Sequence, residues 1–228
     1  MKKLFALFAI LLFSINLVGC QEISDSPVST DSIEKVNYPV EVGQLSFDSA
    51  PKTVASLSPA LTEIIYELGY GDLLIGRSSY CDYPEAVKAK TDIGSSVNPN
   101  IGEIIKLKPQ ILVSQSPIAK KDITKIEAAG VRVLILSTPQ TFVELKQCYI
   151  DISSLFGGAI NAQETAEKAL IPLTTALEKA KSTGTFAYIM TYDLAVATGD
   201  TLSSDILSYF GTNIAKDNQK YTITTEEL

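Results

Sequence analysis

Short β-rich runs alternate with helical periods from residue 51 onward, and this alternation constrains the fold more than any other feature of the sequence. The run at 53–57 is followed by Ser58 and Pro59, a hydroxyl cap and a proline at the first helical position, and then by an apolar helical face that ends at Gly69. The predicted strands are 53–57, 72–76, 110–114 and 131–136, and further helices are predicted at 100–109 and 119–129. This pattern is typical of an α/β fold with a largely parallel sheet.

Residues 141–182 depart from the alternation, because two helical periods follow one another there with a break at 156–158. The second period, 161–182, is long, and Pro172 inside it is expected to kink the helix. After Gly184 a β pattern resumes at 185–192, and a helix is predicted around 203–210. We therefore expect two α/β lobes, 37–140 and 184–228, joined by connecting helices at 141–183 that include one long helix.

The second predicted lobe is short. Residues 185–228 supply one clear strand and one or two helices, which is too little to bury a sheet on both faces. Thr224 or Thr225 resembles a helix N-cap with acidic residues after it, so the chain is expected to end where a helix begins. These features predict an incomplete second lobe and a C-terminally truncated chain.

The N-terminus predicts export. Lys2 and Lys3 precede an apolar run at 4–18, which is shorter than the roughly 20 residues of a spanning helix and is typical of a signal peptide at 1–19. The run ends in LVGC, which looks like the lipidation signature of bacterial lipoproteins, so Cys20 is expected to carry the lipid. The polar stretch that follows is expected to act with Cys20 as a flexible tether at 20–36. The alternative, an ordinary secreted protein in which Cys20 occurs by chance, is less favoured.

Charge and composition exclude several function classes. The chain carries a formal charge of −7, which becomes −9 when the two lysines of the signal peptide are removed, and its two arginines are Arg77 and Arg132. This acidic chain lacks the basic surface expected of a nucleic-acid-binding protein and the arginine cluster that grips phosphates or highly anionic ligands.

Histidine is absent from the sequence, which excludes Ser-His-Asp catalysis, Cys-His catalysis and any metal or haem site that needs an imidazole. Once Cys20 is lipidated, Cys81 and Cys148 remain, and two cysteines alone cannot complete a zinc site. Cys148 lies in a helical apolar period and is expected to pack in the core. A disulfide between Cys81 and Cys148 is left open.

Four segments, taken in order along the chain, resemble one known family. They are similar to the helical-backbone class of ABC-importer substrate-binding proteins, and most of all to its cobalamin (corrinoid) branch. The segments are SLSPALTEIIYELG, SSYCDYPEA, NPNIGEIIKLKPQILVS and AAGVRVLIL. The resemblance covers about residues 50–228. It implies two Rossmann-like lobes bridged by a long backbone helix, here 161–182, with the ligand held in the cleft between them.

The resemblance also implies the walls of the binding site. Tyr80 matches a position where an aromatic ring lies against the ligand, and the turn 82–84 would hold its loop in shape, while Cys81 would take no part. The other wall positions are Ser96, Gln115 and Tyr192, each at or just beyond the carboxyl end of a predicted strand. The cobalamin receptors often have tryptophan where this chain has Ser96 and Gln115, so a more polar pocket is expected. The alternative for Tyr80 is an aromatic that simply packs in the core.

In this family each lobe also presents an acidic residue to the permease. Glu226 matches in the second lobe, whereas in the first lobe the expected glutamate falls on Gly102 and leaves Glu103 as the candidate. The alternative for both is a solvated acid at a helix start.

The resemblance therefore implies a monomeric binding protein without enzymatic activity or a resident cofactor. It would be lipid-anchored on the outer side of a bacterial membrane, deliver cobalamin or a related corrinoid to an ABC permease and its ATPase subunits, and bind no nucleic acid. A ferric siderophore is the second cargo and haem the third, with Tyr80 or Tyr192 as candidate iron ligand. Two other classes stay open: an extracytoplasmic enzyme built on paired carboxylates, for which no acidic pair stands out, and a remnant that no longer binds.

Overall fold

The computed structural model describes residues 37–220 and 222–224. The predicted signal peptide, the whole predicted tether at 20–36 with Cys20, and Glu226 lie outside the described residues. Within the described part of the chain, no helix has both the length and the apolar character needed to cross a bilayer.

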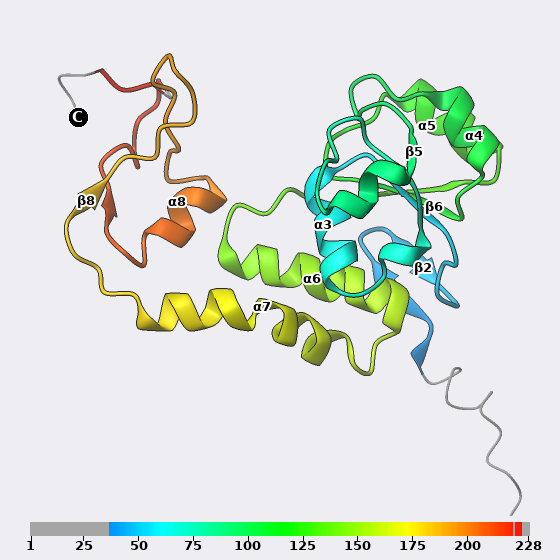
Figure 1. The fold of residues 1–228 in the computed structure, drawn as a ribbon, viewed down its shortest axis with the longest axis horizontal. Helices are drawn as coiled ribbons and strands as arrows, with labels where there is room; N and C mark the ends of the chain where they lie inside the picture. Colours follow the sequence, from blue (N-terminus) through cyan, green and yellow to red (C-terminus); the bar gives the residue numbers. More distant parts are fainter. Residues whose placement is uncertain (1–36, 221, 225–228) are drawn as a thin grey trace, which may run out of the picture. The chain divides into compact units, whose positions relative to one another are not determined.

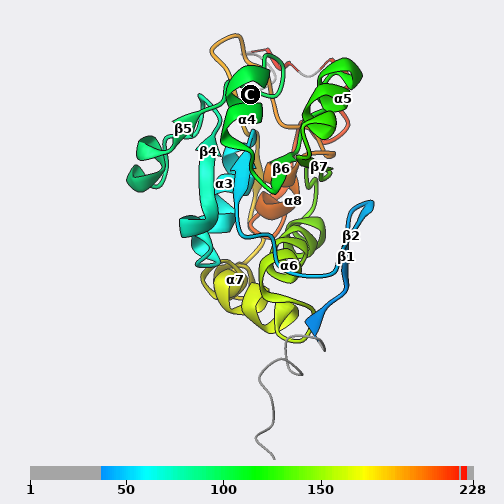
Figure 2. The same ribbon diagram turned by 90° about the vertical axis from the view of Figure 1, so that its right-hand side faces the viewer.

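A five-stranded parallel sheet lies at the centre of the fold, in the order β5-β4-β3-β6-β7 (Figures 1 and 2). Its strands are β3 (Val54–Ser56), β4 (Leu74–Arg77), β5 (Thr91–Asp92), β6 (Ile111–Ser114) and β7 (Arg132–Ile135). The α/β fold class and the four predicted strands are confirmed. The second strand begins later than predicted, because Gly71–Leu73 form a 3₁₀ turn in which the Leu73 amide donates to the Tyr70 carbonyl at 3.0 Å. The short edge strand β5 was not predicted.

Helices cover both faces of this sheet. The residues of the central strands alternate between the faces: Val54 and Val113 belong to one apolar cluster, and Ala55 belongs to the other. The first cluster contains side chains of α3 (Pro59–Glu67) and α6 (Phe142–Gly157), and the second those of α4 (Ile101–Leu107) and α5 (Lys120–Ala128). Ser58 caps α3 as predicted, with its hydroxyl accepting from the Leu61 amide at 3.3 Å.

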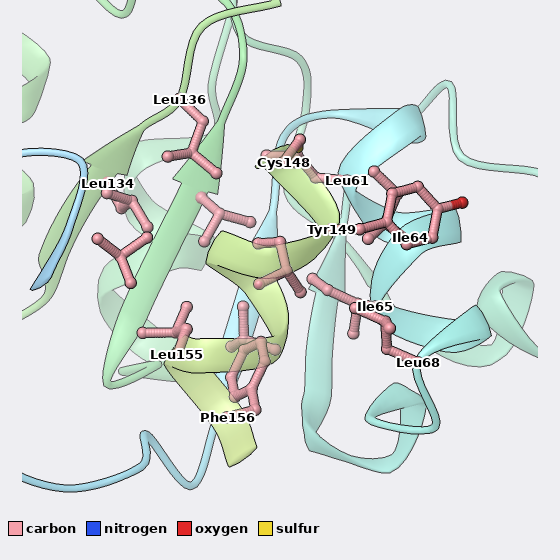
Figure 3. Packing of buried hydrophobic residues seen from close by; sticks show 14 of the residues in the cluster. Leu61, Ile64, Ile65, Leu68, Leu134, Leu136, Cys148, Tyr149, Leu155 and Phe156 are labelled. Carbon is pink, nitrogen blue, oxygen red and sulfur yellow. The ribbon is translucent and has the colours of Figure 1, made fainter. Parts of the chain in front are cut away.

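Helix α6 forms the centre of the first cluster (Figure 3). Its side chains Cys148, Leu155 and Phe156 lie between Leu134 and Leu136 of the β7 region and the apolar face of α3. Tyr149 adds a polar link, because its phenol donates to Glu67 of α3. Burial raises the pKa of Tyr149, and the neighbouring Glu67 carboxylate raises it further, so the phenol keeps its proton.

A hairpin that the sequence analysis missed precedes the sheet. Strands β1 (Val40–Val42) and β2 (Leu45–Phe47) pair antiparallel, and β1 packs on α6. The guanidinium of Arg132 in β7 lies 4.0 Å from the centre of the Phe47 ring and donates to the Ser46 carbonyl at 2.7 Å. The hairpin therefore closes over the β7 side of the sheet.

The predicted pair of long helices is present. After α6, helix α7 (Ala162–Lys179) runs beside it and contains Pro172 (Figures 1 and 2). Proline cannot donate a backbone hydrogen bond within a helix. The hydroxyl of Thr174 donates to the Leu170 and Ile171 carbonyls, both at 3.1 Å.

The C-terminal segment, defined as residues 185–220 and 222–224, contains β8 (Thr185–Phe186), α8 (Leu202–Leu207) and β9 (Thr212–Asn213), with β8 and β9 parallel. The strand predicted at 185–192 is wrong beyond Phe186. The chain turns back on itself there, since the Met190 amide donates to the Ala195 carbonyl at 2.7 Å, and Ile189 makes only an isolated bridge with Val196. Helix α8 ends at Leu207, three residues earlier than the predicted end at 210.

Ile152→Ala should lower the free energy of unfolding by about 2–5 kcal/mol, because Ile152 is fully buried in α6 and the substitution leaves a cavity. Ile171→Ala is the matched control, since Ile171 lies on α7 with 55% of its surface exposed. Urea unfolding of both variants measures the difference. Equal midpoints for the two variants would contradict the assignment of α6 to the core.

Candidate functional site

The loops that follow the parallel strands all emerge at one edge of the sheet, because the carboxyl ends of parallel strands point the same way. Ser58 follows β3, Tyr80 follows β4, Ser96 follows β5 and Gln115 follows β6. The predicted wall residues of the sheet region therefore share this edge, which we call the carboxyl edge.

Three buried serines shape the loops at the carboxyl edge. Each lies at the end of a strand or directly after it, and its Oγ accepts a hydrogen bond from the backbone amide two residues later. The pairs are Ser56 with the Ser58 amide at 3.2 Å, Ser78 with the Tyr80 amide at 3.2 Å, and Ser114 with the Ser116 amide at 3.1 Å. Since these amides are satisfied from inside the protein, each strand end determines the course of its own loop.

At the end of β5, Asp92 likewise accepts a hydrogen bond from the backbone amide two residues later. Its Oδ1 accepts from the Gly94 amide and from the Ser79 hydroxyl, each at 2.8 Å. These two hydrogen bonds lower the pKa of the Asp92 carboxyl, with burial opposing them and Arg77, 3.8 Å away, adding to the decrease. Asp92 thus ties the loop after β5 to the loop after β4.

The loop that carries Tyr80 is held by the side chains of Arg77 and Cys81. Arg77 donates to the carbonyls of Ser78 and Cys81, at 2.9 and 3.4 Å, and its Nε is buried without an acceptor among the described residues. The Cys81 thiol is buried and lies 3.3 Å from the Thr62 hydroxyl of α3. Tyr80 itself is 71% exposed, so the structure contradicts the alternative of a core aromatic. Cys81 anchors the loop and Tyr80 faces outward.

Ser96 is half-buried in a tight turn in which the backbone amides and carbonyls of Ser95 and Asn98 bond each other at 3.2 Å. The Ser79 amide donates to the Gly94 carbonyl at 2.8 Å. The structure therefore brings the loops of Tyr80 and Ser96 together.

Gln115 links three elements at the carboxyl edge. Its Oε1 accepts from the Ser58 hydroxyl at 2.9 Å, its Nε2 approaches the Cys148 sulfur of α6 at 3.8 Å, and its carbonyl accepts from Thr138 at 3.2 Å. Both ends of its amide are thus engaged within the protein, so Gln115 holds the start of α3 in place as well as lining a pocket.

That pocket lies where the carboxyl edge meets the start of α8 and has a volume of about 380 Å³. We call it the edge pocket. Its walls are mostly apolar, and its one charged lining residue among those described is Asp200. The lining residues are Ala60, Ile64, Gln115, Thr138, Pro139, Gln140, Leu145, Asp200, Thr201, Leu202 and Ser203.

Gln115 lines the edge pocket, whereas Tyr80, Ser96 and Tyr192 do not. Tyr192 is fully exposed in the turn after Met190, so the expected position just beyond a strand is wrong for this residue. The sequence analysis missed the contributions of Thr138 and Asp200. Both belong to loops, and neither carries a periodic signal.

Glu103 lies in the first turn of α4, half-buried, with its carboxylate 3.2 Å from the Lys106 amine. Asn100 caps the same helix by accepting from the Glu103 amide at 3.1 Å. Among the described residues, no group of three or more cysteine or acidic side chains is arranged to hold a metal ion.

The comparisons with known proteins decide the family. The model of the periplasmic binding protein family matches residues 54–222. The chain belongs to this family.

Two curated relatives show the same relationship. An uncharacterized ABC transporter substrate-binding lipoprotein of Bacillus subtilis, YvrC, is 30% identical over 191 residues, which are 80% of this chain and 60% of that protein. A vitamin B12-binding protein of Photorhabdus laumondii is 30% identical over 173 residues, which are 73% of this chain and 62% of that protein. The chain thus spans about 60% of the length of these relatives.

Solved structures share the fold at lower identity. The periplasmic vitamin B12 binding protein BtuF of Vibrio cholerae has a TM-score of 0.60 at 22% identity, covering 78% of this chain and 72% of that one. The periplasmic haem binding protein HutB of the same species has a TM-score of 0.62 at 18% identity, covering 77% and 71%. The iron uptake protein PiuA of Streptococcus pneumoniae has a TM-score of 0.63 at 16% identity, covering 83% and 73%. The shared fold extends across neighbours named for different cargoes.

The two described cysteines are free and buried, so a disulfide between them is absent. Burial raises the pKa of the Cys81 thiol and raises the pKa of Cys148 to about 12. In a Cys20→Ser chain, we expect no fast reaction with a disulfide reagent at pH 8, because the thiolate is the reactive form, and two reactive thiols after unfolding in urea. Rapid labelling of the native protein, or fewer than two thiols in urea, would contradict this state of the cysteines.

Proposed function

We propose that this chain is the extracytoplasmic substrate-binding component of an ABC importer and that it captures cobalamin or a related corrinoid at the carboxyl edge of its sheet. The observation that carries the proposal is the position of the edge pocket, beside the strand ends where ligands of open α/β sheets bind. Membership of the periplasmic binding protein family and the vitamin B12-binding relatives support the class and the cargo.

The chemistry of the edge pocket favours a cargo without net negative charge. Ala60, Ile64, Leu145 and Leu202 offer apolar surface, and hydroxyls and amides from other lining residues can orient a polar rim. No lysine or arginine belongs to the described lining, and Asp200 would repel an anion. A corrinoid carries little net charge and many amide groups, which suits these walls.

Tyr80 would provide an aromatic wall outside the edge pocket. Its ring is exposed on a loop fixed by Ser78, Arg77 and Cys81, so it can meet a flat macrocycle at little entropic cost. Ser96 on the adjoining loop would extend the same wall, and Tyr192 would face the ligand from the C-terminal segment.

The second candidate is an iron chelate, either a ferric siderophore or haem. Two exposed phenols, Tyr80 and Tyr192, favour it, since tyrosine can ligate iron, and the fold neighbours named for haem and iron uptake support it. A neutral hydroxamate complex fits the lining better than an anionic chelate does.

The remaining parts of the proposal concern partners and location. The chain would act as a monomer tethered by lipidated Cys20, with lobes at 37–140 and 184–228 and the connecting helices at 141–183. Glu103 and Glu226 would dock on the permease. Because Glu103 already pairs with Lys106, its contribution to docking would depend on breaking that surface ion pair.

The cargo is tested by equilibrium dialysis of residues 21–228 against cyanocobalamin, dicyanocobinamide, haemin and a ferric hydroxamate. Saturable retention of a corrinoid near one equivalent is the expected result. Retention of haemin or the hydroxamate alone would replace the cargo by the iron chelate. Failure of a folded chain to retain any of the four probes would overturn the proposed function.

Tyr80→Ala should weaken corrinoid binding about 2- to 10-fold without changing the unfolding midpoint, because an aromatic contact is lost from an exposed loop. Tyr80→Phe should bind a corrinoid almost normally but lose haem if the phenol ligates iron. Tyr209→Ala, which removes a ring exposed after α8, is the control. Titration followed by visible absorbance measures all three variants, and unchanged affinity in Tyr80→Ala would remove Tyr80 from the site.

A further inference from the structure

Two connections between the C-terminal segment and the rest of the described chain bear on the edge pocket. One is covalent, through α7 and the residues that follow it. The other is a contact between α8 and the start of α6, which lie close together in Figure 1. At this contact the carboxylate Oδ2 of Asp205 accepts a hydrogen bond from the Phe142 amide at 2.7 Å, across 63 positions of sequence.

This hydrogen bond completes the N-terminal cap of α6. The first amides of a helix have no partners within the helix. The Thr141 hydroxyl accepts from the Glu144 amide at 3.2 Å, and the Thr141 carbonyl accepts from the Leu145 amide at 2.9 Å. The Glu144 carboxylate in turn accepts from the Gln140 amide at 2.6 Å. The Phe142 amide is satisfied instead by Asp205, a negative charge at the positive end of a 16-residue helix.

The helices that carry Phe142 and Asp205 are each held by other parts of the fold. Helix α6 is packed between β7 and α3, as Figure 3 shows. On the other side, the buried Asn213 side chain donates to the Ser204 hydroxyl at 2.9 Å and to the Ala197 carbonyl at 2.8 Å, which fixes α8 to its own segment. A displacement of α8 would therefore move the whole support of Asp205 rather than one side chain.

The hydrogen bond lies where two walls of the edge pocket meet. Gln140 and Leu145 flank Phe142 in sequence and line the pocket from the α6 side, whereas Leu202 and Ser203 precede Asp205 and line it from the α8 side. The hydrogen bond between Asp205 and Phe142 therefore connects the two walls.

We propose that Asp205 is a positioning residue for ligand binding: its hydrogen bond to the Phe142 amide fixes α8 against α6 and so sets the width of the edge pocket before the ligand arrives. Asp205 does not line the pocket and need not touch the ligand. A preformed pocket spares the ligand the cost of ordering its own walls. This role rests on the proposed function, since it concerns the same pocket.

The test removes each partner of the hydrogen bond separately. Asp205→Ala removes the acceptor, whereas Asp205→Asn keeps an oxygen that can accept. Phe142→Pro removes the donor at the first helical position, where proline is tolerated and where the extended Thr141, at φ −129° and ψ 161°, suits a following proline. Phe142→Ala is its matched control, because it loses the same ring but keeps the amide. Asp217→Ala controls for loss of an exposed carboxylate in the same segment.

Two measurements need no ligand. Spin labels on Lys121→Cys in α5 and Thr212→Cys in β9, both exposed positions, report the distance distribution between the sheet region and the C-terminal segment in a Cys20→Ser chain. Hydrogen exchange reports the Phe142 amide directly. We expect Asp205→Ala and Phe142→Pro to broaden the distance distribution and Asp205→Ala to speed Phe142 exchange at least 10-fold. Asp205→Asn, Phe142→Ala and Asp217→Ala should keep the wild-type distances.

Dialysis against the retained probe gives the binding effect. We expect affinity to fall at least 5-fold in Asp205→Ala and Phe142→Pro and to stay within 2-fold of wild type in the three controls. Unchanged distances and exchange in Asp205→Ala would overturn the inference even if the probe binds. A broadened distribution with unchanged affinity would overturn the positioning role. Retention of no probe by the wild type would overturn the proposed function and this role together, while the distance and exchange data would still decide whether the hydrogen bond holds α8.

Discussion

The parallel sheet has to be covered on both faces, and the rest of the structure depends on this constraint. Its central strands are three or four residues long and largely buried, with apolar side chains toward both faces, so neither face can be left to water. Helices α3 and α6 cover one face and α4 and α5 the other. Because every crossover returns the chain to the same end of the sheet, all the following loops gather at the carboxyl edge, and the candidate site can lie only beside that edge.

At the carboxyl edge, polar side chains at the strand ends form hydrogen bonds that determine the shape of the loops. Ser56, Ser78 and Ser114 satisfy loop amides from below, and Asp92 ties two loops to each other. The three serine oxygens are buried and bonded within the protein, so exposed residues at the edge, such as Tyr80, stand on rigid supports. A binding site that is largely preformed loses little conformational entropy when its ligand arrives.

The sequence predicted what depends on period and on local caps. The alternation of runs located four of the five strands of the sheet, and Ser58 with Pro59 located the start of α3 because a cap acts within four residues. The run at 185–192 has the composition of a strand, but beyond Phe186 it makes only an isolated bridge, between Ile189 and Val196, and pairing is a tertiary property. For the same reason Tyr192 was misplaced.

Most of the candidate site was also beyond prediction from local pattern. Tyr80, Ser96 and Gln115 were chosen from the family resemblance, and the order of strands and helices explains why they share one edge. The serine turns correspond to a weak sequence signal that was not used in the predictions, namely a serine at or directly after the ends of three strands, β3, β4 and β6. Asp200 and Asp205 left none, since their partners lie far away in the sequence or across a pocket.

A joint made of one helix and one charged hydrogen bond has different properties from either alone. Helix α7 limits the direction in which the C-terminal segment can move, but its Pro172 removes one backbone hydrogen bond and leaves a point where bending costs less. The Asp205 contact acts at a distance from that point, on the side of the edge pocket. Because the Asp205 contact holds the C-terminal segment at a second point, it restricts the bending of α7. A pocket held at these two points can keep its width without a ligand and still widen when the Asp205 hydrogen bond opens, because none of the apolar clusters formed by the described residues extends across the contact between α6 and α8.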